Sequence, residues 1–256
     1  MDNGDNRFMY NPHIYAVIIG SEILNGRRVD KHFHFLQRAL AKRGYTLCSV
    51  EIIKDDEALI TGSFQRIRDD EKSMMFCFGG IGSTPDDLTR AIASAVFRSA
   101  PPVRHAKFER DIIERFGDGA FPNRIHMAEL PEGAGLLRNP FNNMSGFYLD
   151  DRYFFMPGFP EMAHPMVEEA IARFLPQNTP LFRRTLIARC SEDALVTIMK
   201  EVPADIECSS LPMFIDKKPN VEISVASFDA GSTALYFNKF VAYLELTATP
   251  FEIKTT

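Results

Sequence analysis

The sequence of 256 residues contains no tryptophan and only four cysteines, at positions 48, 77, 190 and 208. These cysteines lie far apart and form no Cys-x-x-Cys pair, which argues against a zinc ribbon or a thioredoxin-like redox motif. We therefore expect buried free thiols in a reducing compartment. The six histidines include no His-x-x-x-His spacing, so the sequence predicts no pair of metal ligands on one helix face.

Long apolar runs and a surplus of positive charge are both missing. No apolar stretch approaches the ~20 residues that a membrane-spanning helix needs. Acidic residues outnumber basic ones by 34 to 29, and the formal charge of −5 argues against a nucleic-acid-binding protein. The first six residues are polar and acidic, unlike a secretory signal. We expect a cytoplasmic protein whose partners are neither membranes nor nucleic acids.

The chain does contain a regular alternation of strand and helix patterns. Apolar runs of strand length occur at residues 14–19 and 74–78, and residues 47–53 are predicted to form a further strand. Residues between and after these runs repeat at helical spacing, on faces formed by Val29, Phe33, Leu36 and Leu40, by Ile60, Phe64 and Ile67, and by Leu88, Ala91, Ile92, Ala95 and Val96. Such alternation predicts an α/β fold with right-handed crossovers and a mostly parallel sheet.

A proline-rich segment, residues 176–180, is the best candidate for a linker. It separates a first domain, residues 1–178, from a small α/β domain, residues 179–256. We expect the first domain to fold alone, because its strand–helix series is complete before the linker. The second domain shows a strand at 184–190, a helix at 192–202, a strand at 221–228 and a helix at 232–246.

The segment from Gly79 to Thr89 is the most informative part of the chain, because it places three glycines in four positions between a strand and a helix. Such a loop lets backbone amides approach an anion at a helix N-terminus. The adjacent carboxylates of Asp86 and Asp87 would repel a phosphate unless a divalent cation bridged them. Helix capping is the other interpretation, with Thr84 as N-cap, Pro85 at the first position and Asp87 at the third.

Three polar clusters follow predicted strands. They are Gly20-Ser21-Glu22, Lys54-Asp55-Asp56 and the segment from Gly79 to Asp87. Because the carboxyl ends of parallel strands meet at one edge of a sheet, where α/β proteins bind ligands, we expect these clusters to lie together. For Asp55 and Asp56, capping of the next helix is as good an interpretation as a functional role.

With these motifs, the chain resembles the CinA-type (competence/damage-inducible) branch of the molybdopterin-binding-domain superfamily, which is related to MogA and MoaB. The resemblance covers residues 14–175 and rests on the motifs Gly20-Ser21-Glu22-Ile23-Leu24-Asn25-Gly26, Asp30, Asp55, residues 79–89, residues 142–147 and residues 156–162. The remaining residues resemble the small α/β module that follows this domain in CinA-like proteins. The deamidase domain of full-length CinA proteins has no counterpart here, so its activity is not expected.

The resemblance implies a Rossmann-like three-layer fold that binds nucleotides or pterins, and a homodimer. It also implies hydrolysis of a nucleotide diphosphate such as ADP-ribose or FAD, dependent on Mg²⁺, Mn²⁺ or Co²⁺. Together with the loop chemistry it selects candidate residues: for catalysis Asp87, Glu22 and Asp55; for the metal Asp86 and Asp87; and for the substrate Gly20, Ser21, Gly79, Gly80, Gly82, Ser83, Thr84, Asn142 and Gly158.

Several positions depart from the family pattern. Ser21 stands where the family usually has aspartate, which removes a carboxylate from the predicted site. Ser83 replaces a proline, and the family's Asp-x-Asn is Asp30-Lys31-His32 here, with His32 expected on a helix surface. Two other functions therefore stay open: a molybdopterin-binding or adenylyl-transfer-like protein, and a nucleotide-binding module without catalysis.

Overall fold

The computed structural model describes residues 12–254, and the acidic residues 1–6 lie outside this range. The chain divides into two compact units, the first ending at Asn178 and the second beginning at Thr179. Each unit is treated by itself. Among the described residues, no helix has the length and apolar character needed to cross a membrane.

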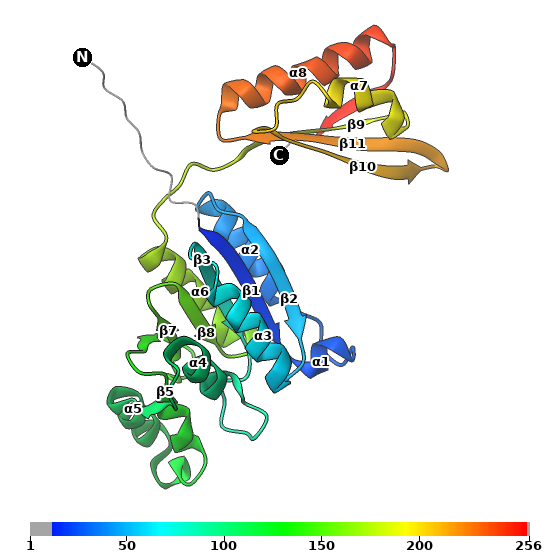
Figure 1. Ribbon diagram of the computed structural model, residues 1–256. Coiled ribbons are helices and arrows are strands. Elements are labelled where there is room, and N and C mark those ends of the chain that lie inside the picture. The colour runs from blue at the N-terminus through cyan, green and yellow to red at the C-terminus, as the bar shows by residue number, and fades with distance from the viewer. Residues whose placement is uncertain (1–11, 255–256) are drawn as a thin grey trace, which may run out of the picture. The chain divides into compact units, whose positions relative to one another are not determined.

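The first unit is built on a six-stranded sheet with the strand order β2-β1-β3-β8-β7-β6 (Figure 1). Four strands are parallel: β1 (His13–Ile19), β2 (Leu47–Ile53), β3 (Ser73–Phe78) and β8 (Tyr153–Met156). The strand β7 (Gly146–Leu149) runs antiparallel to β8, and β6 (Gly135–Leu137) pairs antiparallel with β7. All six residues of β3 are buried, as expected for a strand that helices cover on both faces.

Helices cover both faces of this sheet and make it a three-layer structure (Figure 1). One face packs on α2 (His32–Lys42) and α6 (Pro160–Phe174), and the other on α3 (Glu57–Arg68), α4 (Thr89–Arg98) and α5 (Ala106–Phe116). Alternate residues of β1 serve the two cores, because Ala16 and Ile18 face α2 and α6 whereas Val17 and Ile19 face α3 and α4. The expected α/β fold with a mostly parallel sheet is confirmed.

The connections in the first unit are short elements. They are the single turn α1 (Ser21–Leu24), the 3₁₀ helices η1 (Gly117–Ala120) and η2 (Arg124–Ala128), and the two-stranded ribbon of β4 (Val103–Arg104) and β5 (Glu129–Leu130).

Two expectations about single residues of the first unit were wrong. Val29 lies before α2 and is 79% exposed, and Cys48 is exposed whereas Cys77 is buried as expected.

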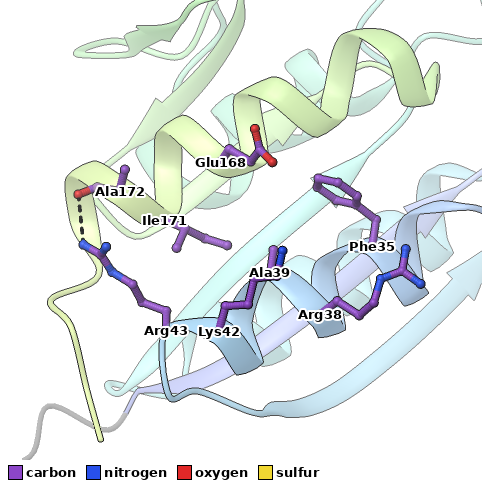
Figure 2. Close-up of a pocket in the computed structure, with 8 residues that line it drawn as sticks. All are labelled: Phe35, Arg38, Ala39, Lys42, Arg43, Glu168, Ile171 and Ala172. Carbon is purple, nitrogen blue, oxygen red and sulfur yellow. Dashed lines mark hydrogen bonds between the residues drawn. The ribbon is translucent and has the colours of Figure 1, made fainter. Parts of the chain in front are cut away.

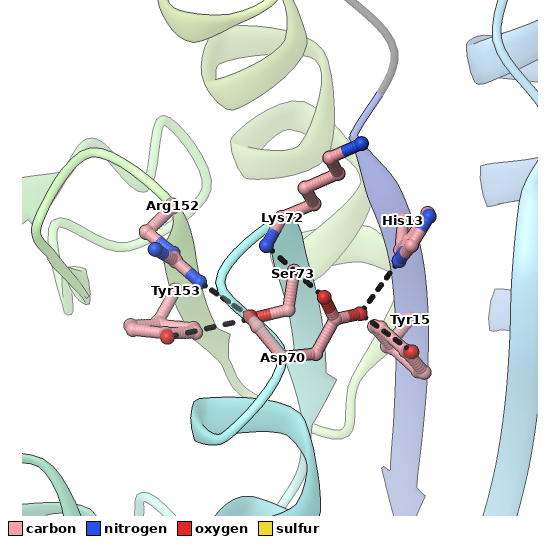
Figure 3. A network of polar contacts seen from close by, with 7 residues as sticks. All are labelled: His13, Tyr15, Asp70, Lys72, Ser73, Arg152 and Tyr153. Atoms are coloured by element: carbon pink, nitrogen blue, oxygen red, sulfur yellow. Dashed lines mark hydrogen bonds and ion pairs between the residues drawn. The ribbon is translucent and has the colours of Figure 1, made fainter.

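The edge formed by the amino ends of the strands is held by hydrogen bonds around Asp70 (Figure 3). Its carboxylate accepts hydrogen bonds from Tyr15 Oη at 2.9 Å and from the backbone amide of Lys72, and it pairs with His13 Nδ1 at 2.7 Å. Arg152 donates to the Asp70 carbonyl oxygen and to the Ser73 hydroxyl, which links β8 to the same point. This network fixes the neighbouring strands β1, β3 and β8 at their amino ends.

The second unit is an antiparallel sheet with the order β10-β11-β9-β12, which packs on a long helix (Figure 1). Its elements are β9 (Phe182–Ala188), η3 (Glu192–Leu195), α7 (Val196–Met199), β10 (Glu207–Ile215), β11 (Lys218–Ser227), α8 (Ala230–Leu246) and β12 (Phe251–Lys254). The order β-α-β-β-α-β is that of the ferredoxin-like, split βαβ motif. The sequence missed β10 and β12, and the helix expected at 192–202 is only the short pair η3 and α7.

Candidate ligand-binding site

The loop between β3 and α4 needs its first two glycines for close packing. Gly79 and Gly80 both have positive φ, at 98° and 67°. A Cβ atom on Gly79 would lie 2.2 Å from the carbonyl oxygen of Ile19, and one on Gly80 would lie 2.3 Å from Thr89 Oγ1. The Thr89 hydroxyl donates to the Gly79 carbonyl oxygen at 3.0 Å. These glycines therefore bring the loop against the end of β1 and the start of α4 at once.

Asp87 closes the loop from inside. Its carboxylate accepts hydrogen bonds from the amide of Gly82 at 2.7 Å, from the amide of Thr84 at 2.8 Å and from Thr84 Oγ1 at 2.6 Å. A Cβ on Gly82 would lie 2.6 Å from Asp87 Oδ2, which explains the third glycine. Helix α4 begins only at Thr89, so the expectation that Thr84 caps this helix is wrong. Asp87 braces the turn that precedes the helix.

Three loop amides are left without an acceptor. Among the described residues, none accepts a hydrogen bond from the amides of Gly80, Ile81 or Ser83. Arg90 lies behind them and donates to the Gly82 carbonyl oxygen. Burial lowers the pKa of Arg90 below its usual value, while the neighbouring carboxylates of Asp87 and Glu129 act in the opposite direction. Free amides backed by a guanidinium form a favourable environment for an anion.

Ser21 and Asp55 join the ends of β1 and β2 next to this loop. One oxygen of Asp55 accepts hydrogen bonds from both the amide and the hydroxyl of Ser21, each at 2.8 Å. The amide of Gly20 donates to the Ile53 carbonyl oxygen and pairs the same two strand ends. Asp56 caps α3 by accepting from the Leu59 amide. For Asp55 and Asp56, capping of the next helix and a functional role were both open. Asp56 is the cap of α3, whereas Asp55 does not cap the helix and instead bonds to Ser21.

Glu22 lies one residue further along, where its carboxylate pairs with Arg28 at 3.6 Å. The Arg28 guanidinium lies over the ring of Phe159, 5.4 Å from the ring centroid, and the Phe159 side chain is 52% exposed. Arg28 thereby connects the chain after β1 with the start of α6. This arrangement supplies a carboxylate, a cation and an aromatic face at the same edge of the sheet.

Gly158 follows β8 and packs directly on the glycine loop. A Cβ on Gly158 would lie 3.6 Å from the Cα of Gly79, and the Gly79 amide donates to the Met156 carbonyl oxygen. On the other side, the carbonyl oxygen of Gly158 contacts His32 Nε2 at 3.3 Å. His32 is only 3% exposed, so the expectation that it lies on a helix surface is wrong. In the sequence, the one sign that His32 is not an ordinary helix-surface residue was that it departs from the family's Asp-x-Asn at this position.

Asn142 lies in the loop between β6 and β7. Its side-chain oxygen accepts from the Met144 amide at 2.9 Å and from Asn139 Nδ2 at 2.6 Å. Its nitrogen lies 3.6 Å from the sulfur of Met162 in the first turn of α6. These contacts hold its own loop against α6, so the amide group is largely committed to structural bonds.

The carboxylates predicted for catalysis and for metal binding do not form a common cluster. No group of three or more His, Cys, Asp or Glu side chains suited to a metal ion occurs within residues 12–254. Asp55 is bonded to Ser21, Glu22 pairs with Arg28, and Asp87 is bonded to loop amides. The residues at this edge therefore do not match the oxygen-rich coordination that Mg²⁺ or Mn²⁺ prefers.

A second region with basic side chains is a groove between α2 and α6 (Figure 2). Arg38 and Lys42 line one wall and have no ion-pair partner within the described part of the chain. Arg43 instead donates to the carbonyl oxygens of Ala172 and Leu175. Glu168 stands on the opposite wall and offsets part of the positive charge. The groove has no glycine loop and no free backbone amides, which distinguishes it from the site after β3.

Comparison with known proteins agrees with the family resemblance that the sequence motifs indicate. Residues 15–177 match the family described as "Probable molybdopterin binding domain". A protein of Caldivirga maquilingensis is 27% identical over 83% of this chain and 87% of its own length. A "CinA-like protein" of Acaryochloris marina is 29% identical over 62% of this chain, and a "Putative competence-damage inducible protein" of Streptococcus gordonii is 30% identical over 73%. The chain spans only 39% and 46% of the lengths of these last two relatives.

Among solved structures, CinA from Thermoplasma acidophilum, whose function is described as unknown, is similar with a TM-score of 0.56 and 22% sequence identity. The similarity covers 63% of this chain and 97% of that one. At this level of identity the comparison supports the fold of the first unit, and the chemistry of the site has to be argued from its own residues.

Proposed function

This chain belongs to the family of probable molybdopterin binding domains, and on that premise we propose that its glycine loop binds the phosphate of a pterin or nucleotide ligand. The protein acts in this proposal as a binding module that does not itself hydrolyse the ligand. The observation that carries the proposal is the set of unpartnered amides at Gly80, Ile81 and Ser83.

The loop is suited to a phosphate because its backbone is already fixed. Asp87 occupies the amides of Gly82 and Thr84, so only the neighbouring amides remain for a ligand. A preorganised loop loses little conformational entropy when the ligand binds, which favours affinity. The adjoining ends of β1 and β8, with Ser21 and Gly158, would line the path from the phosphate to the remainder of the ligand.

Binding without hydrolysis is favoured because the candidate catalytic carboxylates already have partners in the chain. Asp55 is held by two hydrogen bonds from Ser21, and Asp87 by three from the loop. Recruiting Asp87 to a metal would compete with contacts to both of its oxygens, each of which contributes about 0.5–1.5 kcal/mol and more when the acceptor is charged, whereas Asp55 uses only one oxygen for Ser21. An aspartate in place of Ser21 would instead leave two carboxylates facing one another.

Hydrolysis of a nucleotide diphosphate such as ADP-ribose or FAD is the second candidate function. It is favoured by Glu22, whose carboxylate has no hydrogen bond within the described residues and only the long ion pair to Arg28. In that case Glu22 would orient a water molecule for attack on the diphosphate held by the loop.

A panel of ligands distinguishes the two functions. Inorganic pyrophosphate, ADP-ribose, FAD, NAD and ATP are titrated by calorimetry, and the same mixtures with Mg²⁺, Mn²⁺ or Co²⁺ are analysed for hydrolysis products. We expect at least one ligand to bind, with no turnover under any metal. Metal-dependent turnover would establish the second candidate, and the absence of all binding would refute the proposed site.

A further inference from the structure

Two histidines on neighbouring helices of the first unit each have a buried ring nitrogen without a partner. They are His32 in α2 and His164 in α6, and the nitrogens are Nδ1 of His32 and Nε2 of His164. Among the described residues, none exchanges a hydrogen bond with either nitrogen. The other nitrogen of His32, Nε2, lies 3.3 Å from the Gly158 carbonyl oxygen. Because a carbonyl can only accept, Nε2 carries the hydrogen in the neutral ring.

The two imidazoles belong to one column of ring contacts. His32 stacks on Phe78 of β3 with ring centroids 4.4 Å apart, and His164 stacks on Phe35 of α2 at 3.7 Å. The imidazoles themselves meet edge to face, with centroids 5.6 Å apart. The column joins β3, α2 and α6, so a charge on either imidazole acts on the contact between the two helices.

This environment favours the neutral form of both rings. Burial is the main cause that lowers the pKa of His32 and of His164 below the usual value. The carboxylates of Asp30 and Glu161 act in the opposite direction on both rings, and Glu168 does so on His164. A proton on His32 Nδ1 or His164 Nε2 would be a buried donor without an acceptor. Two charged rings in contact would also repel one another.

The remaining charged groups near His32 lie around a small recess that its side chain lines. They are Glu22, Arg28 and Lys31. Glu22 pairs with Arg28 at 3.6 Å. Both oxygens of Asp30, which also lines the recess, accept hydrogen bonds from backbone amides at the start of α2, each at 3.0 Å. These two carboxylates therefore already have partners in the chain.

Gly158 connects the two imidazoles to the glycine loop. Its carbonyl oxygen accepts the hydrogen of His32 Nε2, and a Cβ on Gly158 would lie 3.6 Å from the Cα of Gly79. The Gly79 amide donates to the Met156 carbonyl oxygen, two residues before Gly158. A displacement of the His32 ring would therefore move the residue on which Gly79 packs.

We propose that His32 and His164 form a pH-sensitive latch: as neutral rings they hold α2 against α6 and Gly158 against the glycine loop, and protonation releases both contacts. The latch concerns the loop without its ligand and so goes beyond the proposed function. A histidine whose pKa is lowered on folding stabilises the fold above its unfolded-state pKa of about 6.5. That contribution decreases as the pH falls from this value towards the folded-state pKa. Between the two values, each histidine can raise the unfolding equilibrium constant by up to about ten-fold per pH unit.

An NMR titration of the unmodified protein from about pH 8 to about pH 4.5, without ligand, tests the latch. The imidazole resonances of His32 and His164 should titrate with midpoints below about 6.5. The amide resonances of Gly79 and Gly80 should shift with the same midpoint as His32. Midpoints at or above about 6.5, or loop amides that do not follow His32, would overturn the inference. Because no ligand is present, this result is independent of whether the loop binds an anion.

The variants His32→Phe and His164→Phe provide the second arm, because phenylalanine keeps a stacking ring and removes the titrating nitrogens. Denaturant unfolding of the parent should become easier below about pH 6.5, and each variant should lose its share of that change, up to about ten-fold per pH unit in the unfolding constant. His32→Phe should also abolish the pH-dependent shift of the Gly79 amide. The exposed neighbour in α2 offers the matched control His34→Phe, which should keep both effects. A parent-like pH dependence in His32→Phe and His164→Phe would contradict the latch. If a variant fails to fold, the titration of the unmodified protein decides alone.

Discussion

One oxygen of the Asp55 carboxylate accepts two hydrogen bonds from Ser21, from the backbone amide and from the hydroxyl, each at 2.8 Å. The pair closes the gap between the carboxyl ends of β1 and β2. The CinA-type family usually has an aspartate at position 21, so Ser21 turns a pair of carboxylates into a neutral donor and a charged acceptor. Asp55 thereby has a hydrogen-bonded partner within the chain.

Ser21→Asp should therefore create a metal response that the parent chain lacks. In the absence of metal, two facing carboxylates and the lost hydroxyl contact should lower the free energy of unfolding by about 1–3 kcal/mol. Mn²⁺ should then raise the melting temperature of the variant and leave the parent nearly unchanged, because only the variant offers paired carboxylates. Thermal melts with and without Mn²⁺ measure this, and Ser21→Asn is the uncharged control. An equal Mn²⁺ response in parent and variant would show that position 21 does not decide metal binding.

Gly80→Ala should disrupt the loop. Gly80 combines a φ of 67° with a Cβ position only 2.3 Å from Thr89 Oγ1. We expect a loss of stability of about 2–5 kcal/mol, from the left-handed backbone and from overpacking against the buried Thr89. Gly133→Ala is the matched control, because Gly133 has a φ of 74° and nothing within 4 Å of its Cβ position. That control should lose about 1–2 kcal/mol in denaturant unfolding. Equal losses for the two variants would mean that Gly80 does not pack as described.

Asp87→Asn separates loop bracing from catalysis. The carboxylate accepts three hydrogen bonds within the loop, and an asparagine oxygen cannot replace their charge-assisted strength. We expect a loss of about 1–3 kcal/mol in the free energy of unfolding together with weaker pyrophosphate binding. The control is Asp86→Asn: Asp86 is exposed, and because a hydrogen bond from Thr84 lowers its pKa, this variant should lose some stability but less than Asp87→Asn. An Asp87 variant with unchanged melting but lost hydrolytic activity would identify Asp87 as a catalytic group.

The Asp70 network predicts a defined dependence of stability on pH. Burial raises the pKa of Asp70, but hydrogen bonds from His13 and Tyr15 outweigh that effect and hold the pKa below its usual value (Figure 3). A depressed carboxyl pKa contributes stability above the unfolded-state value of about 3.9, and this stability is lost as the pH falls through the folded-state pKa. The free energies of unfolding of the parent and of Asp70→Asn should differ at pH 7 and converge as the pH falls below about 3.9. A constant difference over this range would contradict the role assigned to Asp70.

Much of the first unit could be predicted because most residues of its central strands are apolar. The apolar run that ends at Phe78 agrees with β3, and the strand predicted at residues 47–53 agrees with β2, although Ser49 and Glu51 interrupt its apolar residues. The second unit was harder. Strand β10 contains exposed residues such as Leu211 and Phe214 and a proline at position 212, so neither burial nor alternation marks it as a strand. Its place at the sheet edge, a tertiary property, permits this composition.

The site could be predicted in outline but not in its internal contacts. The glycines and the strand ends identified the edge, because their spacing is local in the sequence. The helical pattern predicted from Leu88 agrees with α4, which begins at Thr89, but the capping interpretation placed the N-cap too early, at Thr84. The carboxylate of Asp87 accepts hydrogen bonds from the amides of Gly82 and Thr84 and does not serve a helix that begins at Thr84. His32 was misplaced because its burial depends on Phe78 and on Gly158, 126 residues away in the chain.

The central claim is that an anion binds the amides of the loop after β3, and a ¹H–¹⁵N NMR titration with inorganic pyrophosphate tests it most directly. We predict saturable shifts of the Gly80, Ile81 and Ser83 amide resonances. The amides beside Arg38 and Lys42, in the groove between α2 and α6, should stay unchanged (Figure 2). Shifts confined to that groove, or no saturable shift in the loop, would contradict the claim.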